Sequence, residues 1–192
     1  MHSPSPLGRI MTTYGYALFD TAIGACGIAW SERGVTRLQL PEADRTATEK
    51  RVRARSPGVT PAEPPVAVAE AIAALQRYLN GERTDFSSVA LDLARASPFD
   101  RKIYDAARTV PWGETASYGE LATKAGVPGE AREAGQSLSR NPVAIIVPCH
   151  RVLKSGGKPG GFSAYDGVLT KERLLALENV ELRPPVLPGL FA

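Results

Sequence analysis

The first part of the chain alternates short apolar runs with glycine-containing breaks. Residues 14–40 read YGYALFDTAIGACGIAWSERGVTRLQL. Apolar and β-branched residues interrupted in this way are typical of short strands joined by tight turns. The pattern predicts a small antiparallel sheet with Gly34 in a hairpin turn. Cys26 lies inside it, and we interpret it as a small buried hydrophobic side chain.

Helical spacing begins after a polar stretch. Residues 41–65 are charged and contain several prolines, so we expect an irregular connection there. Apolar side chains then recur at helical spacing over residues 66–79, and an Asn-Gly pair stops the predicted helix. Residues 82–96 predict another strand and a linker, with a domain boundary near Arg95.

The second half carries stronger helix signals. A Ser-Pro pair at residues 97–98 predicts the capped start of a helix that ends at Pro111. Residues 117–120, SYGE, form a capping box that begins a short helix closed by Gly126. A second short helix is predicted over about residues 130–139. This pair has the arrangement of a helix-turn-helix, although the pattern alone favours a plain αα-hairpin.

The last part of the chain combines an apolar run, a loop and a helix. Residues 143–147 are apolar and lead directly into Pro148-Cys149-His150-Arg151. A glycine-rich loop follows at residues 154–167. The final helix is predicted from Val168 to Glu178, with four leucines facing inward: Leu169, Leu174, Leu175 and Leu177.

These elements predict an α/β protein of the α+β type. We expect an N-terminal domain over residues 14–95, with a small antiparallel sheet and a helix. A C-terminal helical domain with a winged-helix-like helix-turn-helix is expected over residues 96–180. Residues 1–13 and 181–192 are expected to be disordered tails.

Composition and charge narrow the class of protein. The 192 residues are 43% hydrophobic and 22% charged, which is ordinary for a globular protein, and no apolar run approaches the roughly 18 residues of a membrane helix. No apolar segment of a signal peptide is present, so a cytoplasmic location is expected. The net charge of +3 is compatible with a nucleic-acid partner but supports one only weakly, because acidic and basic residues alternate. Two cysteines and two histidines are too few for an expected zinc site, and we expect two free thiols.

Cys149 and His150 carry the most distinctive chemistry of the sequence. A cysteine is an effective nucleophile only as thiolate, so it needs a base or a positive field nearby. Neighbouring side chains of an extended chain point in opposite directions, and we therefore expect a bridging water between the two. A carboxylate should fix the histidine tautomer, and Glu178 is one candidate among several. Taken alone, a cysteine after an apolar strand is more often a packed core residue than a nucleophile.

Three segments closely resemble the O6-alkylguanine-DNA alkyltransferase family: PFDRKIYDAARTVPWGETASYGELA, EAREAGQSLSRNPVAIIVPCHRV and GGFSAYDGVLTKERLLALE. The similarity is nearly continuous from Ser97 to Glu178 and weaker in the N-terminal half. The PCHRV motif preceded by RNP is highly specific. The resemblance implies DNA repair by single-turnover transfer of an alkyl (methyl) group from O6-alkylguanine in double-stranded DNA to Cys149, after base flipping. Activity on O4-alkylthymine is left open.

The resemblance also implies roles for individual residues. Cys149 would be the alkyl acceptor, activated through His150, a water and Glu178. Asn141 would shape the active-site turn. Tyr118 would press on the phosphate beside the target nucleotide, and it could also donate a hydrogen bond to the flipped base.

Two further groups are implied by the resemblance. Arg132 would be the finger of the recognition helix that fills the space left by the flipped base. The DNA-binding residues would be Tyr118, Ala131, Arg132, Gly135 and Arg140. The substrate pocket would be lined by Pro148, Val152, Phe162, Ser163 and Tyr165.

The sequence departs from the family pattern at two places. Glu133 follows Arg132 where the family usually carries a small apolar residue. A carboxylate turned toward DNA would be repelled, whereas one on the flank of the helix would be harmless, and we favour the flank. The loop GGFSAYDGV is longer than the shortest family loops. It leaves open whether Phe162 or Tyr165 closes the pocket, and so which alkyl groups fit.

Two other functions compete with alkyl transfer. A sensor would flip damaged guanine without reacting, as alkyltransferase-like relatives do, but those relatives lack the cysteine. A turnover thiol enzyme such as a hydrolase is compatible with the Cys-His pair, but it leaves the SYGE and RNP motifs unexplained. The expected partner is double-stranded DNA with an alkylated guanine. No cofactor, metal, membrane or obligate protein partner is implied, and we expect a monomer without a regulatory role.

Overall fold

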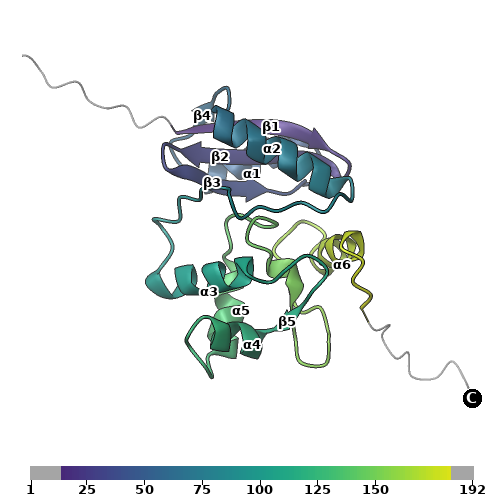
Figure 1. Ribbon diagram of the computed structural model, residues 1–192. Coiled ribbons are helices and arrows are strands. Elements are labelled where there is room, and N and C mark those ends of the chain that lie inside the picture. Colours follow the sequence, from purple (N-terminus) through teal and green to yellow (C-terminus); the bar gives the residue numbers. More distant parts are fainter. Residues whose placement is uncertain (1–13, 183–192) are drawn as a thin grey trace, which may run out of the picture.

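The structure, a computed structural model, describes residues 14–182. The expectations for residues 1–13 and for most of 181–192 lie outside this part. An N-terminal sheet with two helices stands beside a C-terminal group of helices (Figure 1). The predicted α+β fold is thereby confirmed. Within residues 14–182 we find no helix of the length and hydropathy needed to span a membrane.

The N-terminal sheet is built mainly from three antiparallel strands. These are β1 (Gly15–Thr21), β2 (Gly24–Ser31) and β3 (Gly34–Gln39). The short strand β4 (Thr60–Pro61) pairs in parallel with β1, so the strand order is β3-β2-β1-β4. Gly34 has a φ of 137° and pairs with Ser31 across the β2–β3 turn, as predicted from the Ser-Glu-Arg-Gly break.

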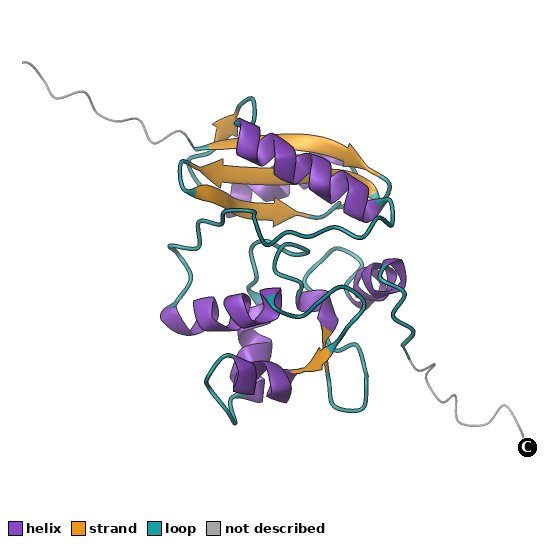
Figure 2. Cartoon of the chain, in the orientation of Figure 1, coloured by secondary structure: helices purple, strands orange, loops and turns teal. Residues whose placement is uncertain are grey.

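Helices cover both faces of this sheet (Figure 2). Helix α2 (Val66–Leu79) has the predicted bounds and packs in the same apolar cluster as Cys26 of β2. Helix α1 (Arg45–Arg55) lies on the opposite face, where its Val52 joins Ala29 in a separate cluster. Successive residues of a strand point to opposite faces, so β2 is buried on both sides. Cys26 is fully buried and has a free thiol, as expected.

Two predictions for the connections were wrong. Residues 41–65 contain α1, which buries only Thr48 and Val52 and therefore shows almost no apolar periodicity. Its start is set by Asp44, whose side chain accepts a hydrogen bond from the amide of Ala47. Residues 82–96 form no strand, because only an isolated bridge joins Leu91 to β3.

The C-terminal half contains the predicted helices. Helix α3 (Pro98–Arg108) begins after the N-cap Ser97, and α4 (Tyr118–Lys124) begins with the predicted capping box. Helix α5 (Ala131–Ser139) packs against both α3 and α4. The short strands β5 (Ala116–Ser117) and β6 (Val152–Leu153) pair in parallel.

The last helix, α6 (Val168–Leu177), corrects one detail of the sequence analysis. Leu174 and Leu175 are buried as expected, and Leu177 is partly buried. Leu169, however, is 57% exposed and does not face inward. The buried face of α6 carries Lys171, Leu174 and Leu175, and at about 100° per residue Leu169 falls on the opposite side of the helix.

The run before the cysteine is not extended. The amide of Val147 donates to the carbonyl of Val143 over 2.9 Å, and Ile145 between them has a φ of 73°. The chain then enters a 3₁₀ turn, η1 (Cys149–Arg151). The expectation that Cys149 and His150 point to opposite sides of an extended strand therefore does not apply.

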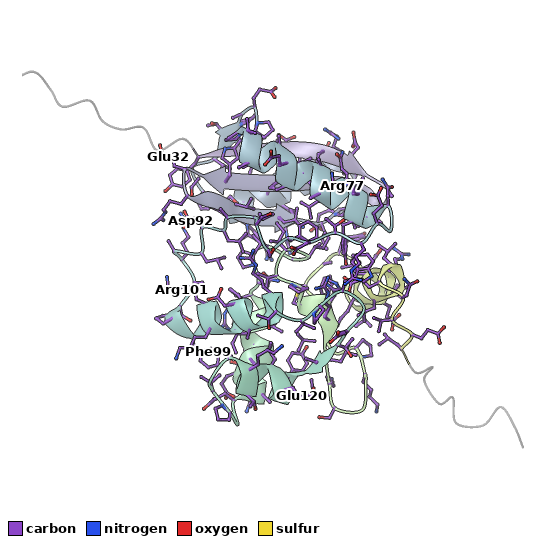
Figure 3. The ribbon with its side chains drawn as sticks, viewed as in Figure 1. Glu32, Arg77, Asp92, Phe99, Arg101 and Glu120 are labelled. Carbon is purple, nitrogen blue, oxygen red and sulfur yellow. The ribbon has the colours of Figure 1, made fainter. Side chains whose placement is uncertain are left out.

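One apolar cluster extends through both halves of the molecule. It includes Ile28 and Leu75 from the first half and Ile103, Val147 and Leu174 from the second. A backbone hydrogen bond of 2.9 Å from Leu38 to the carbonyl of Pro142 also joins them. Figure 3 shows the dense layer of side chains between the sheet and the C-terminal helices. The domain division near Arg95 stays a prediction.

Candidate active site

Cys149 lies at the first position of η1 and is 5% exposed. The side-chain amide of Asn141 donates to its Sγ over 3.2 Å and to the carbonyl of Val147 over 2.9 Å. The amide of Val143 in turn donates to Asn141 Oδ1 over 3.0 Å. One buried side chain thus ties both ends of the turn around Ile145 to the sulfur.

His150 is fully buried and is held through one ring nitrogen. Its Nε2 lies 2.7 Å from Glu178 Oε1, whereas Nδ1 has no hydrogen-bond partner among the residues described. Because Glu178 faces Nε2, that nitrogen carries the proton and Nδ1 is left as the basic position. Burial is the main cause that lowers the pKa of His150, outweighing the opposite effect of Glu178.

Glu178, at the C-terminal end of α6, receives several hydrogen bonds. Arg151 donates from Nε to Oε2 over 2.8 Å and from Nη2 to Oε1 over 3.0 Å, and the amide of Gly113 donates to Oε2 over 3.3 Å. Burial raises the pKa of this carboxyl, but the bonds from His150 and Arg151 prevail and bring it to about 2. Glu178 is therefore ionised at neutral pH. The sequence left it as one candidate among several.

Tyr78 and Arg151 join this cluster, and the sequence analysis missed both. Tyr78 comes from α2, and its hydroxyl donates to Glu178 Oε1 over 2.6 Å. Arg151 also donates from Nη1 to the carbonyl of Val110 over 2.6 Å. Arg151 could have been inferred from its place after His150, but a contact across 100 residues leaves no local signal in the sequence.

Lys171 is a third residue that was missed. This lysine of α6 is 1% exposed, donates to the carbonyl of Val152 over 2.6 Å and lies 6.0 Å from the ring centre of Tyr118. Burial lowers its pKa to about 8, although the nearby Cys149 acts in the other direction. Burial raises the pKa of the Cys149 thiol, and the Asn141 hydrogen bond and the Lys171 charge oppose this effect.

Tyr118 stands between three parts of the C-terminal half. It is the first residue of α4 and is partly buried. A Cβ at Gly135 of α5 would lie 3.6 Å from its ring, and a Cβ at Gly160 would lie 3.2 Å from its hydroxyl. Burial, and then the proximity of Cys149, raise the pKa of Tyr118. The structure thus brings it to the neighbourhood of the cysteine.

The loop over residues 154–167 places its aromatic residues differently. Phe162 is partly buried and packs against the core, whereas Tyr165 is 61% exposed. Tyr165 lines a cavity with Ile23 and Leu40 of the N-terminal half, a cavity to which Cys149 does not contribute. Ser163 is exposed. Of the two aromatic residues, only Phe162 packs toward the interior.

The other predicted pocket residues are buried. Val152 is fully buried in β6. Pro148 is also buried, and it lines a cavity of about 490 Å³ together with Trp112 and Arg151. Cys149 does not line this cavity.

Helix α5 carries the predicted DNA-binding residues. Arg132 is exposed, and Ala131 and Gly135 are partly buried. Arg140 follows the helix, and its guanidinium is 2.8 Å from Asp100 of α3. This ion pair engages one of its nitrogens within the protein.

Glu133 is exposed on α5, and its place on the flank of the DNA-binding surface stays a prediction. It lines a surface hollow with Phe99 and Arg140, to which Arg132 does not contribute. Successive residues of a helix are separated by about 100° around the axis, so the two charges leave the helix in directions about 100° apart. Among the described residues we find no group of three or more His, Cys, Asp or Glu side chains that could hold a metal ion.

Comparison with known proteins covers both halves of the chain. The family described as "6-O-methylguanine DNA methyltransferase, DNA binding domain" matches residues 98–180, and "6-O-methylguanine DNA methyltransferase, ribonuclease-like domain" matches residues 14–93. A methylated-DNA--protein-cysteine methyltransferase of Mycolicibacterium paratuberculosis is 41% identical over 85% of this chain and 92% of its own length.

Two solved structures from Mycobacterium tuberculosis are also similar. The structure of its O6-methylguanine methyltransferase gives a TM-score of 0.69 at 38% identity, over 86% of this chain and 92% of that one. The structure of its OGT in complex with DNA gives 0.68 at 37% identity, over 86% of this chain and 93% of that one.

Proposed function

Because the chain belongs to the 6-O-methylguanine DNA methyltransferase family, we propose that it repairs DNA by moving an alkyl group from O6 of guanine onto its own Cys149. One observation carries this proposal. Cys149 Sγ accepts a hydrogen bond from Asn141, and the next residue is a buried histidine whose Nε2 is bound to an ionised carboxylate. A cysteine beside an oriented base is the arrangement that nucleophilic catalysis requires.

The reaction starts with removal of the thiol proton. The proton passes from Cys149 Sγ, through a water, to Nδ1 of His150, and Glu178 stabilises the imidazolium that forms. Asn141 and the charge of Lys171 stabilise the thiolate. These groups oppose the effect of burial, which by itself favours the uncharged thiol.

The thiolate then attacks the alkyl carbon of the lesion. A sulfur–carbon bond forms, the carbon–O6 bond breaks, and its electron pair remains on the guanine. Protonation at N3 or hydrogen bonds near O6 neutralise this charge, and the Tyr118 hydroxyl is a candidate donor. The thioether on Cys149 has no easy reversal, so each molecule reacts once.

DNA must present the base outside the helix. Cys149 is 5% exposed, and an alkyl group on a base stacked within a duplex cannot reach it. We propose that α5 lies against the minor groove, that Arg132 fills the place of the flipped base and that Tyr118 acts on the neighbouring phosphate. Ala131 and Gly135 give close approach, and Arg140 contacts the backbone.

The pocket for the flipped base is proposed to lie between Cys149, Val152 and the loop over residues 154–167. Phe162 closes it, with Ser163 beside it, because Phe162 packs inward and Tyr165 does not.

We further propose a cytoplasmic location. Activity on O4-alkylthymine is a matter for direct assay.

The test is intact-mass spectrometry after incubation with a duplex that contains one O6-methylguanine. We expect each protein molecule to gain one methyl group, located on Cys149, in a stoichiometric burst. Cys149→Ser should bind the duplex and gain none. A folded protein that binds the lesion without an adduct would instead indicate a sensor, and continued release of free product would indicate a turnover enzyme.

A further inference from the structure

The N-terminal half contributes a side chain to the catalytic cluster. Tyr78 of α2 is fully buried, and its hydroxyl donates to Glu178 Oε1 over 2.6 Å. The hydroxyl oxygen of Tyr78 also lies 3.0 Å from His150 Nε2. We propose that Tyr78 is a positioning residue for alkyl transfer, which holds the His150 ring with Nδ1 toward the thiol. This proposal rests on the function proposed above.

The positions of the protons support this role. Glu178 is ionised and can only accept, so the single proton of the Tyr78 hydroxyl points to Glu178. The hydroxyl oxygen is then left as an acceptor beside His150 Nε2. Two oxygens, one from Glu178 and one from Tyr78, therefore face the same N–H and oppose rotation of the ring.

The Tyr78 ring is itself fixed by aromatic neighbours. It packs edge-to-face on Trp112 and on Phe86, with ring centres 5.3 Å and 5.6 Å apart, and on His150 at 6.2 Å. Phe86 follows α2 in the N-terminal half, and Trp112 follows α3 in the C-terminal half, so both halves hold the ring. These contacts fix the ring, and so they hold the Tyr78 hydroxyl against His150 and Glu178.

His150 needs support on the Nε2 side. Its Nδ1 has no hydrogen-bond partner among residues 14–182, so no protein group holds the ring from the side that acts as base. Orientation depends on the bonds at Nε2. Loss of the Tyr78 hydroxyl removes one of the two acceptors there and one of the donors that fix Glu178.

The experiment compares rates of methyl transfer from an O6-methylguanine duplex to Cys149 in the full chain. Tyr78→Phe should slow transfer on the order of tenfold, a part of the effect typical of a general base. In a His150→Ala background the same substitution should have no further effect, because Tyr78 acts through the imidazole. A structural role alone would slow both backgrounds equally.

Tyr16→Phe is the matched control. Tyr16 is a buried tyrosine of the same half, and its hydroxyl also donates to a carboxylate, Glu49, over 2.5 Å. Tyr16→Phe should leave the rate of methyl transfer unchanged. Urea unfolding gives the stability of each variant. If His150→Ala does not fold, His150→Asn replaces it.

A second readout separates this proposal from the proposed function. Iodoacetamide forms a sulfur–carbon bond with thiolate and releases iodide, without DNA, and peptide mass distinguishes Cys149 from Cys26. The same dependence on Tyr78 and His150 is expected. That result with no methylation by the duplex would reject the repair function and keep the role of Tyr78. Equal rates for Tyr78→Phe and the unaltered protein, or equal slowing in both backgrounds, would overturn that role.

Discussion

At the scale of single residues, Glu178 carries a charge where an isolated carboxylate would be strongly destabilised. It is 1% exposed and is ionised because Arg151, His150 and Tyr78 donate to it. Its pKa of about 2 lies below the ordinary value of 4.5. Such a group stabilises the fold at a pH above its unfolded pKa and ceases to do so as the pH falls toward the folded value.

We therefore expect Glu178→Gln to lower the free energy of unfolding by about 3 kcal/mol at neutral pH, because it leaves the buried Arg151 charge unpaired. The difference from the unaltered protein should shrink between pH 4.5 and about 2, where the natural carboxyl takes up a proton. Urea unfolding across this pH range is the measurement. As a control, Asp166→Asn at the exposed pair with Arg173 should change stability by less than about 1 kcal/mol at neutral pH.

The reactive residues could be predicted from the sequence better than the buried residues that hydrogen-bond to them. The motif around Cys149 and His150 is local, and the resemblance extended it to Asn141 and Glu178. Tyr78 and Lys171 were missed because burial of a polar side chain and contacts between distant segments leave no spacing to detect. The same limit applied to Phe162 and Tyr165, whose different environments depend on how the loop packs.

At the scale of elements, helix α5 separates two charges that the sequence puts side by side. Arg132 is exposed, and Glu133 lines a surface hollow with Phe99 and Arg140 to which Arg132 does not contribute. We expect Arg132→Ala to slow methyl transfer from duplex DNA by about tenfold or more, and to leave the iodoacetamide reaction of Cys149 unchanged. Glu133→Gln should change duplex affinity by less than about threefold. Binding and single-turnover rates at fixed salt test both, and equal losses from the two variants would contradict this assignment.

Helix α1 depends on a close approach to the sheet. A Cβ at Gly27 would lie 2.3 Å from Val52 Cγ2, so Gly27→Ala must displace the Val52 side chain or α1 itself. We expect a loss of about 1–3 kcal/mol of unfolding free energy, measured by urea unfolding. Gly119→Ala in α4 is the control, because its Cβ would meet only Ser117 Oγ at 3.9 Å, and no loss is expected there.

Elements with a helical or strand pattern and a stop signal could be predicted, whereas a cap alone, as at Asp44 of α1, was not enough. Helices α2, α3 and α4 had both a pattern and a stop signal in the sequence. Helix α1 buries one aliphatic residue, Val52, so its polar sequence was taken for a loop. The segment after α2 was taken for a strand, but its backbone is held elsewhere, for example by Arg108, which donates to the carbonyls of Phe86 and Val89.

At the scale of the whole molecule, the two halves share one apolar cluster and a buried hydrogen-bonded cluster. The chain has two tryptophans, Trp30 in the first half and Trp112 in the second. Each of the variants Trp30→Phe and Trp112→Phe keeps one tryptophan, whose fluorescence reports on one half. In each variant we expect the urea midpoint measured by fluorescence to equal the midpoint measured by circular dichroism. Separate midpoints for the two probes would indicate that the halves unfold independently.

The burial of Cys149 also affects how long its thiol stays unmodified before the protein meets a lesion. A protein that reacts once must survive the wait for its lesion among diffusible oxidants and electrophiles. Oxidation of a cysteine follows its thiolate character and its exposure. With Cys149 only 5% exposed and the pKa of its thiol raised by burial, the residue is shielded on both counts. The burial that disfavours the thiolate thus also preserves the thiol until an alkylated guanine is bound.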